Sequence, residues 1–200
     1  MSAKKPYHKE NLRRDLLDAG RAYVRANGHL SLSIRTLAQQ VGVSPGAPYH
    51  HFPDRRSLLL ALATEGFREM LSGSEQVGVS RMNPGDRLRR MGSLFIRFAE
   101  ENSHLIELMY ESELTTPALD AALIPFQQAG HQQLRRQIAD AVPDLSDEEV
   151  DIRVITFWSA IYGFASMRRK GVIHPSDDTL PSVDIADALV DRAALSALMP

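Results

Sequence analysis

The sequence contains no cysteine. Disulfides, thiolate zinc sites, iron–sulfur clusters and cysteine nucleophiles are therefore excluded, and a reducing cytoplasm is the expected compartment. Long hydrophobic runs are missing as well, because the polar and basic start of the chain is not followed by an apolar segment and no stretch approaches the length of a membrane span. We expect a soluble cytoplasmic protein without a secretory signal and without a membrane partner.

A large net charge is also absent, since the formal total is −2. Nucleic-acid-binding domains are normally basic, so this total by itself argues against such a partner. The charge is unevenly distributed, however: residues 1–60 hold ten Lys and Arg against four Asp and Glu, a balance of +6, and residues 61–200 hold thirteen against twenty-one, a balance of −8. The basic N-terminal segment predicts a polyanionic partner for that end of the chain.

No stretch alternates as a β-strand does, and apolar residues recur at helical spacing throughout the chain. We predict an all-α protein in which Ser33, Asp54 and Ser146 cap the starts of helices. A loop around Gly73, Gly78 and Pro84 is the expected boundary between two parts. The predicted helices cover about residues 9–26, 33–41, 45–51, the stretch after Asp54, 85–102, 103–112, 116–141 with a kink at Pro125, 144–167 and 182–198.

The helices predicted at 33–41 and 45–51 are joined by about three residues that include Gly42. This is the geometry of a DNA-binding helix-turn-helix. Ser44 followed by Pro45 is typical of an N-cap and the first residue of a helix. Pro48 removes one backbone hydrogen bond from the second helix, so we expect its first turn to be irregular or tight.

The run from Ser33 to Leu62, SIRTLAQQVGVSPGAPYHHFPDRRSLLLAL, closely resembles the N-terminal domain of the TetR family of transcriptional repressors. The resemblance implies an all-α homodimer that binds a palindromic operator in double-stranded DNA and releases it when a small molecule enters the C-terminal domain. It implies a three-helix DNA-binding domain at 1–54, a connecting fourth helix and loop at 55–80, and an effector-binding and dimerisation domain at 81–200. Neither enzymatic activity nor a cofactor is expected.

The same resemblance assigns roles to single residues. Arg35 matches a position that often reaches DNA, Tyr49 and His51 match donors to phosphates, and Arg55 matches a basic residue at the start of the fourth helix. A cation at that end of a helix is unfavourable by ~0.3–1 kcal/mol, and a bound phosphate would reverse the sign. The predicted DNA-binding residues are Ser33, Arg35, Ser44, Pro45, Gly46, Ala47, Tyr49, His50, His51 and Arg55.

Residues 45–51 contain no Arg, Asn or Gln, so bidentate contacts to base edges must be scarce. We expect sequence preference to come from Arg35, from His50, from apolar contacts of Pro45 and Ala47 with thymine methyl groups, and from DNA shape. Phe52 is expected in the core. The arginines of the first helix, at positions 13, 14, 21 and 25, are expected on a solvated face.

In the C-terminal part, the segment WSAIYG (158–163) resembles the tryptophan–histidine–glycine signature of one branch of TetR-type C-terminal domains, with Tyr162 in the histidine position. Gly163 would permit close helix approach. The uncharged stretch 154–167 predicts a helix buried all round, and dimerisation is expected through about 144–170 and 182–198. A small apolar or aromatic effector would be lined by Phe95, Phe98, His104, Met109, Tyr110, Phe126, His131, Trp158 and Tyr162, although the aromatic pair at 158 and 162 is more often core.

Three other functions remain open. The chain could be a regulator that needs no ligand, or an activator. It could also be a small helical hydrolase, because residues 42–46 match the G-x-S-x-G motif with Ser44 as the nucleophile. That motif needs a preceding strand, and the spacing before Ser44 is helical. His104 and Glu107 stand three residues apart without a recognised metal-site pattern, so no metal is expected.

Overall fold

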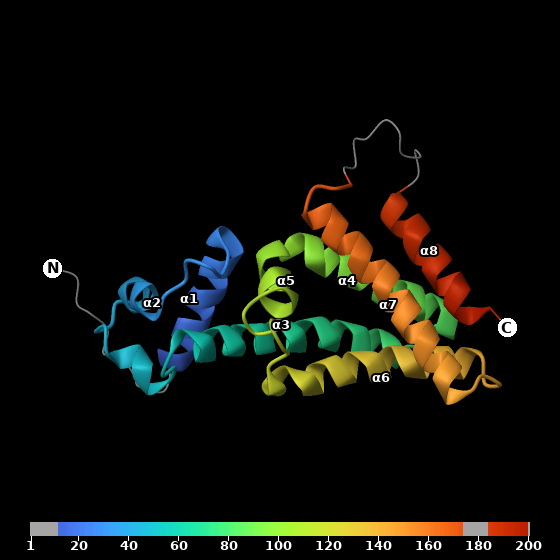
Figure 1. Cartoon of the computed structure of the whole chain (residues 1–200), viewed down its shortest axis with the longest axis horizontal. Coiled ribbons are helices and arrows are strands. Elements are labelled where there is room, and N and C mark those ends of the chain that lie inside the picture. The colour runs from blue at the N-terminus through green and yellow to red at the C-terminus, as the bar shows by residue number, and fades with distance from the viewer. Residues whose placement is uncertain (1–11, 174–183, 200) are drawn as a thin grey trace. The chain divides into compact units, whose positions relative to one another are not determined.

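The computed structural model describes residues 12–173 and 184–199. Within these ranges the chain forms helices and no strand, which confirms the predicted all-α class. The elements are α1 (Leu12–Asn27), α2 (Ile34–Val41), the 3-10 helix η1 (Ala47–His50), α3 (Arg55–Gly78), α4 (Pro84–Glu101), α5 (Ser103–Tyr110), the 3-10 helix η2 (Ala121–Leu123), α6 (Ile124–Ala141), α7 (Asp147–Arg169) and α8 (Ile185–Leu198) (Figure 1).

The chain divides into two compact units. The described residues up to Phe67 group with His104–Ala122 in what we call the head unit. Residues Arg68–Ser103 group with those from Leu123 onwards in the body unit. Neither unit is continuous in sequence, because the segment 104–122, expected with the C-terminal part, groups with the N-terminal helices.

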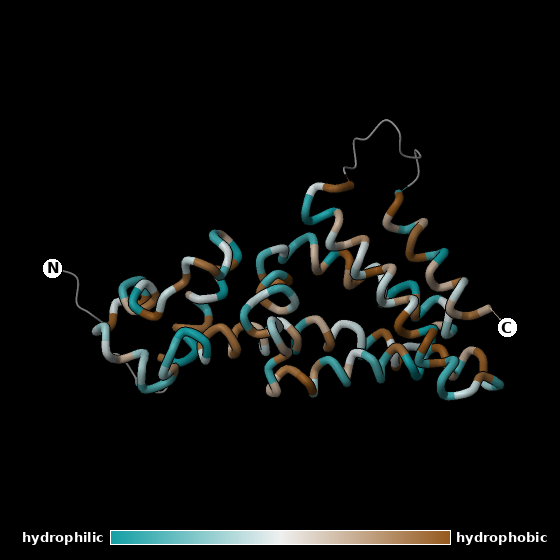
Figure 2. Tube along the Cα trace, in the orientation of Figure 1, coloured by the Kyte–Doolittle hydropathy of each residue, from teal (hydrophilic) through white to brown (hydrophobic). Residues whose placement is uncertain are grey.

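The core of the head unit comes from apolar side chains of α1, α2 and the first half of α3. Leu16, Leu37 and Leu59 are fully buried, and apolar and polar residues alternate along these helices at helical spacing (Figure 2). A Cβ at Gly20 of α1 would lie 3.2 Å from the side chain of Leu62, so α1 and α3 pack closely there. Burial of each such side chain stabilises the fold by about 1.5–3 kcal/mol.

The N-caps predicted at Asp54 and Ser146 are confirmed. The backbone N–H of Ser57 donates to Oδ1 of Asp54 at 2.7 Å, and that of Glu149 donates to Oγ of Ser146 at 3.2 Å. In both cases a side-chain oxygen satisfies an N–H group that has no partner inside its own helix.

The loop predicted around Gly73 is wrong, because α3 continues through this glycine to Gly78. A glycine inside a helix costs about 1 kcal/mol, which packing can offset. A Cβ at Gly78 would lie 3.1 Å from Met91 of α4 and 3.3 Å from Gln137 of α6, so the end of α3 is held tightly against two other helices. The connection to α4 is short, and Pro84 is the first residue of that helix.

The helix predicted from residue 116 with a kink at Pro125 is also wrong. Residues 111–120 form turns and bends, and α6 begins at Ile124. Pro125 therefore lies in the first turn of α6, where its missing N–H would have no partner inside the helix anyway. The proline begins a helix and does not bend one.

The body unit packs α4, α6, α7 and α8 together (Figure 1). A Cβ at Gly92 of α4 would lie 3.2 Å from Phe157 and Ile161 of α7 and 3.3 Å from Val190 of α8. The close approach between helices therefore occurs at Gly92. At Gly163, where we predicted it, no atom lies within 4 Å of the Cβ position.

Helix α7 is not buried all round, contrary to the prediction from its uncharged sequence. Ile155 is 59% exposed, and Ile152 and Met167 are exposed as well. On α8, Leu195 is 56% exposed and Met199 follows just beyond the helix, also exposed. These apolar side chains have no covering element among the described residues of the single chain.

Candidate nucleic-acid interface

Helix α2 begins at a cap that the sequence predicted. The N–H of Thr36 donates to Oγ of Ser33 at 3.0 Å, and the two hydroxyl oxygens lie 2.7 Å apart. Ile34, Leu37 and Ala38 face the core, while Arg35 points outward. Because one face of α2 is buried, the opposite face, which carries Arg35, is exposed to solvent.

The turn after α2 depends on Gly42, which adopts φ +78°. The N–H groups of Gly42 and Val43 both donate to the carbonyl oxygen of Ala38 at 3.0 Å. These bonds end α2 in the left-handed manner that glycine adopts at little cost. The chain then turns into the next helical element, as a helix-turn-helix requires.

The second helix of the motif is shorter than predicted. In place of a helix at 45–51 with Ser44 as its cap, the structure has the four-residue η1 at 47–50, and Gly46 precedes it with no side-chain cap. Pro48 explains the difference, because it cannot donate to residue 44 and its ring disfavours helical geometry at Ala47. The remaining bonds are local, for example from the N–H of His51 to the carbonyl of Pro48 at 2.9 Å.

The exposure of the predicted DNA-binding residues follows from this geometry. Tyr49 is 51% exposed, whereas Phe52 is buried in the core as predicted. Among the ten candidates, those largely in solvent are Arg35, Ser44, Pro45, Gly46, Tyr49 and His50. The four that are partly covered are Ser33, Ala47, His51 and Arg55.

Arg35 is placed as the prediction requires. It is exposed in the first turn of α2, where no acidic residue is present. In the part of the chain that the structure describes, no carboxylate pairs with its guanidinium. The charge is available to a phosphate or a base edge.

The guanidinium of Arg55 is engaged inside the head unit, with partners that the sequence did not predict. Nε donates to the carbonyl of Leu32 at 2.9 Å and Nη2 to that of His29 at 2.7 Å, while Nη1 pairs with the carboxylate of Glu113. An arginine with these partners holds the loop after α1 against the start of α3. These bonds indicate a positioning role for Arg55, and the predicted phosphate contact stays a prediction.

The next residue, Arg56, also bonds to the segment around Glu113. Nη1 of Arg56 donates to the carbonyl of Glu113 at 2.7 Å, and Nη2 donates to Asp120 at 2.6 Å. The N–H of Ala122 and the guanidinium of Arg56 hold the pKa of Asp120 below its usual value. The segment 111–120 is thus fastened to the first turn of α3 by both arginines.

His29, whose carbonyl accepts from Arg55, is buried, at 2% exposure. Nε2 lies 3.8 Å from Oε2 of Glu113, and Nδ1 has no hydrogen-bond partner among the described residues. Burial lowers the pKa of His29, and Arg55 and His104 also lower it, whereas Glu107 and Glu113 oppose the shift. The folded head unit favours the neutral imidazole.

From the sequence we expected Arg13 on a solvated helix face. In the structure its guanidinium lies over the ring of Phe52, 5.5 Å from the ring centre, although the side chain is exposed. This cation–π contact keeps a positive charge beside the end of η1. No sequence pattern could have identified it, because the contact joins residues far apart in the chain.

The predicted effector-lining residues do not form one pocket within a unit. His104, Met109 and Tyr110 belong to the head unit, and the other six belong to the body unit. Three of the six pack on one another: the ring centres of Phe95 and Trp158 are 4.5 Å apart, and those of Trp158 and Tyr162 are 6.1 Å apart.

The polar members of that predicted set have partners in the protein. Nδ1 of His104 lies 3.6 Å from Glu107, and Nε2 of His131 lies 3.0 Å from Asp151. His131 and Arg135 hold the pKa of Asp151 below its usual value. These contacts indicate structural roles.

The alternative site types find no support in the described residues. Helix α2 precedes Ser44, and a nucleophile elbow would need a strand there. No three His, Asp or Glu side chains in the described ranges gather as a metal site. No described helix is both long and apolar enough to cross a membrane.

The fold and the exposed basic residues define an all-α protein with an N-terminal helix-turn-helix. Residues 16–62 match the group described as bacterial regulatory proteins, tetR family, and residues 88–193, more than half of the chain, match the tetracyclin repressor-like C-terminal domain. The chain belongs to the TetR family of regulatory proteins. Neither description mentions the tryptophan–histidine–glycine branch, which stays a prediction.

Known proteins agree with this assignment. The chain is 36% identical over 67 residues to the HTH-type transcriptional repressor Rv1474c of Mycobacterium tuberculosis, a match that covers 34% of this chain and 36% of that repressor, so the chain spans just over a third of the relative's length. A Rhodococcus sp. RHA1 protein of unknown function has a TM-score of 0.79 and 26% identity, with 98% of this chain and 97% of that chain covered.

A second structure shows the fold alone. The TetR family transcriptional regulator PfmR of Thermus thermophilus has a TM-score of 0.64 at 18% identity, with 92% of this chain and 96% of that chain covered. The fold is therefore that of the family over nearly the whole chain.

Proposed function

We propose that the protein is a homodimeric repressor that binds a palindromic operator through its head unit. The observation that carries the proposal is the exposed surface of α2 and η1, where Arg35, Tyr49 and His50 lie in solvent on the segment with the +6 balance. Phosphate contacts position such a protein on DNA and base contacts give it sequence preference. This surface offers donors for both.

Preference for one sequence rests on few residues. Arg35 is the donor suited to bidentate contact with guanine, and His50 supplies a single further donor. Pro45 is exposed and Ala47 half-buried, so both can meet thymine methyl groups in the major groove. The remaining preference would come from the shape of the DNA.

The dimer is proposed to form through the outward faces of α7 and α8. Ile152 and Ile155 on α7, with Leu195 and Met199 at α8, present apolar surface that the single chain leaves uncovered. The open space around Gly163 would let a second copy approach closely. An isologous pairing of these helices gives a four-helix bundle that presents two head units to successive DNA half-sites.

Release by a small molecule completes the proposal. A ligand can act only if it prefers one dimer state and DNA prefers another, and the coupling between them is reciprocal. A cytoplasmic location follows from access to DNA and from the absence of cysteine. A regulator that needs no ligand, or an activator, would share the same DNA surface.

Selection of bound fragments from random DNA with the full-length protein tests the proposal. We expect a palindrome whose half-sites are about one helical turn apart or slightly more, with affinity that falls steeply as salt rises. Arg35→Ala should weaken operator binding roughly ten-fold and relax the preferred sequence. Arg136→Ala, an exposed arginine of α6 in the body unit, is the matched control and should bind as the parent does.

Two results would contradict the proposal. One is selection without any enriched sequence. The other is an Arg35→Ala protein that keeps the parent's affinity and preference, which would place the interface elsewhere.

A further inference from the structure

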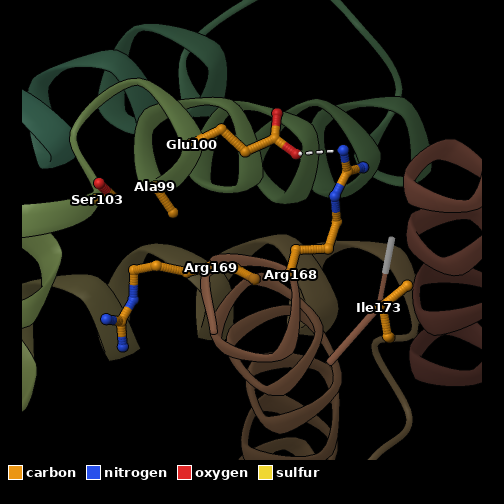
Figure 3. A pocket seen from close by; sticks show the side chains of 7 residues that line it. Ala99, Glu100, Ser103, Arg168, Arg169 and Ile173 are labelled. Carbon is orange, nitrogen blue, oxygen red and sulfur yellow. Dashed lines mark ion pairs between the residues drawn. The ribbon is translucent and has the colours of Figure 1, made fainter. Parts of the chain in front are cut away.

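A cavity of about 310 Å³ opens in the body unit between the last turn of α4 and the last turn of α7. This volume is at the lower end of the range for small-molecule sites. Figure 3 shows that polar side chains from both helices line it. The lining residues are Ala99, Glu100, Ser103, Ala165, Arg168, Arg169 and Ile173.

The guanidinium of Arg168 gives the cavity its chemical character. Nη2 of Arg168 lies 3.2 Å from Oε1 of Glu100, so one carboxylate already rests on this arginine. Figure 3 shows Arg168 turned toward Glu100, while Arg169 leaves α7 in a different direction. The charged pair at the cavity is therefore that of Arg168 and Glu100, and Glu100 shows that a carboxylate fits at Arg168.

Arg168 is held in place by a second contact. Its guanidinium lies over the ring of Phe164, 5.7 Å from the ring centre, and only a quarter of the side chain is exposed. A planar guanidinium fixed in this way is preorganised for a carboxylate. Glu100 is more exposed, at 43%, so it can turn into solvent.

The rest of the wall is small and mostly apolar. Ala99 and Ala165 are buried, Ile173 adds an aliphatic surface, and Ser103 contributes a hydroxyl group. Such a wall suits a short hydrocarbon body next to an anionic head. The volume corresponds to about ten water molecules, which restricts the ligand to a small one.

We propose that this cavity binds a small organic monocarboxylate as the effector, with its carboxylate replacing that of Glu100 at Arg168. The inference rests on the proposed function, since it names the class of molecule to which the repressor responds. It replaces the apolar or aromatic effector expected from the sequence. Exchange of one carboxylate for another keeps the charge of Arg168 compensated and frees Glu100.

The position of the cavity suits an effector. Ser103 lines it, and the next residue, His104, belongs to the head unit. A ligand that contacts Ser103 thus acts at one of the points where the chain passes between the units. Displacement of the last turn of α4 would be passed to α5 through Asn102, the one residue between the two helices.

Calorimetric titration of the full-length protein without DNA tests the inference. The probes are acetate, butyrate, hexanoate and benzoate, with hexanamide as a neutral match for hexanoate. We expect at least one carboxylate to bind with a dissociation constant below about 10 mM and hexanamide to bind at least ten-fold more weakly. Failure of all four carboxylates, or equal binding of hexanamide, overturns the inference.

Variants locate the binding. Arg168→Gln should weaken the carboxylate at least ten-fold and Arg168→Lys less, because lysine keeps the charge without the planar fork. Arg169→Gln is a second variant on the same cavity, useful if Arg168→Gln does not fold by circular dichroism. Glu100→Gln should tighten binding about two- to five-fold, since the internal competitor is removed.

Arg136→Gln is the control and should leave carboxylate binding unchanged. Binding that survives both Arg168→Gln and Arg169→Gln, or that Glu100→Gln weakens, overturns the assignment. Operator binding without any carboxylate is measured separately. A protein that binds its operator but no carboxylate refutes this inference alone, whereas one that binds carboxylate but no DNA refutes the proposed function.

Discussion

At the scale of single residues, Arg55 illustrates how one physical argument permits two partners. A positive charge at the start of a helix is unfavourable unless an anion compensates it. From the sequence we expected a DNA phosphate to supply the anion. The structure supplies Glu113, which is 58 residues away and lies against the same guanidinium.

We expect Arg55→Ala to destabilise the protein by roughly 2 kcal/mol, because it removes the charge-assisted bonds to Glu113 and to the carbonyls of His29 and Leu32. The dependence of DNA affinity on salt should keep the parent's slope, since the guanidinium of Arg55 already has partners inside the protein. Urea unfolding and binding at several salt concentrations measure the two effects.

Arg14→Ala is the matched control for stability, because Arg14 is highly exposed and its ion pair with Asp18 is long, at 3.9 Å, and lies in solvent. It should change the free energy of unfolding by less than about 0.5 kcal/mol. If the Arg55→Ala protein is as stable as the parent and its salt slope falls by about one, Arg55 contacts a phosphate and its proposed positioning role is wrong.

His29 adds a dependence on pH. Its pKa is lowered in the folded protein, so the unfolded chain binds more protons below about pH 6.5. The stabilisation is present above the unfolded pKa and is lost as pH falls through it. Thermal unfolding should show a larger drop in Tm from about pH 7.5 to about pH 5.5 in the parent than in His29→Leu.

His50→Gln is the control for this measurement, because His50 is exposed. It should keep the parent's full drop in Tm. An identical drop in His29→Leu would show that the imidazole of His29 is not responsible.

At the scale of elements, the two helices of the motif differ in how well their sequences specify them. For α2, the cap, the apolar spacing and the terminal glycine all agree, and the predicted bounds are confirmed. For η1, Ser44 followed by Pro45 predicted a helix over 45–51, while Pro48 predicted an irregular or tight first turn; the structure has only a four-residue 3-10 helix there. Where local signals conflict, the missing hydrogen-bond donor decides the result.

Gly42 and Gly46 provide a matched test of the turn. A Cβ at either position would meet no atom within 4 Å, so sterics within the fold do not distinguish them. Gly42 has φ +78° and Gly46 has φ −85°. Gly42→Ala should therefore cost roughly 1–2 kcal/mol, whereas Gly46→Ala should be neutral or stabilising by up to about 1 kcal/mol.

Thermal and urea unfolding of the two alanine variants measure the difference. Because both substitutions add the same methyl group, the comparison isolates the backbone. Equal effects at the two positions would contradict the role given to the left-handed turn.

At the scale of the whole molecule, the near-zero net charge is the sum of two unlike segments. The basic balance lies in the part that carries the helix-turn-helix, and the acidic balance lies in the remainder. An acidic body discourages non-specific contact with DNA. The exposed apolar residues of α7 and α8 lie in that remainder and predict where two copies meet.

Ile155→Glu should convert the dimer into a monomer, because each dimer would bury two carboxylates in an apolar interface. Analytical ultracentrifugation measures the mass in solution. Val79→Glu, at an apolar residue that is 80% exposed in the loop after α3, is the control and should leave the dimer intact. A dimeric Ile155→Glu protein would place the interface on another surface.

The sequence alone determined the helical class, the caps at Ser33 and Ser146, and the position of the helix-turn-helix. These features follow from residue spacing and from bonds between residues a few positions apart, so they can be predicted from the order of residues in the chain. Only the tertiary structure decided that Arg55 pairs with Glu113, that Arg13 lies over Phe52, and that Arg168 of α7 pairs with Glu100 of α4 beside a cavity. Such contacts join distant segments, and their geometry depends on how whole helices pack.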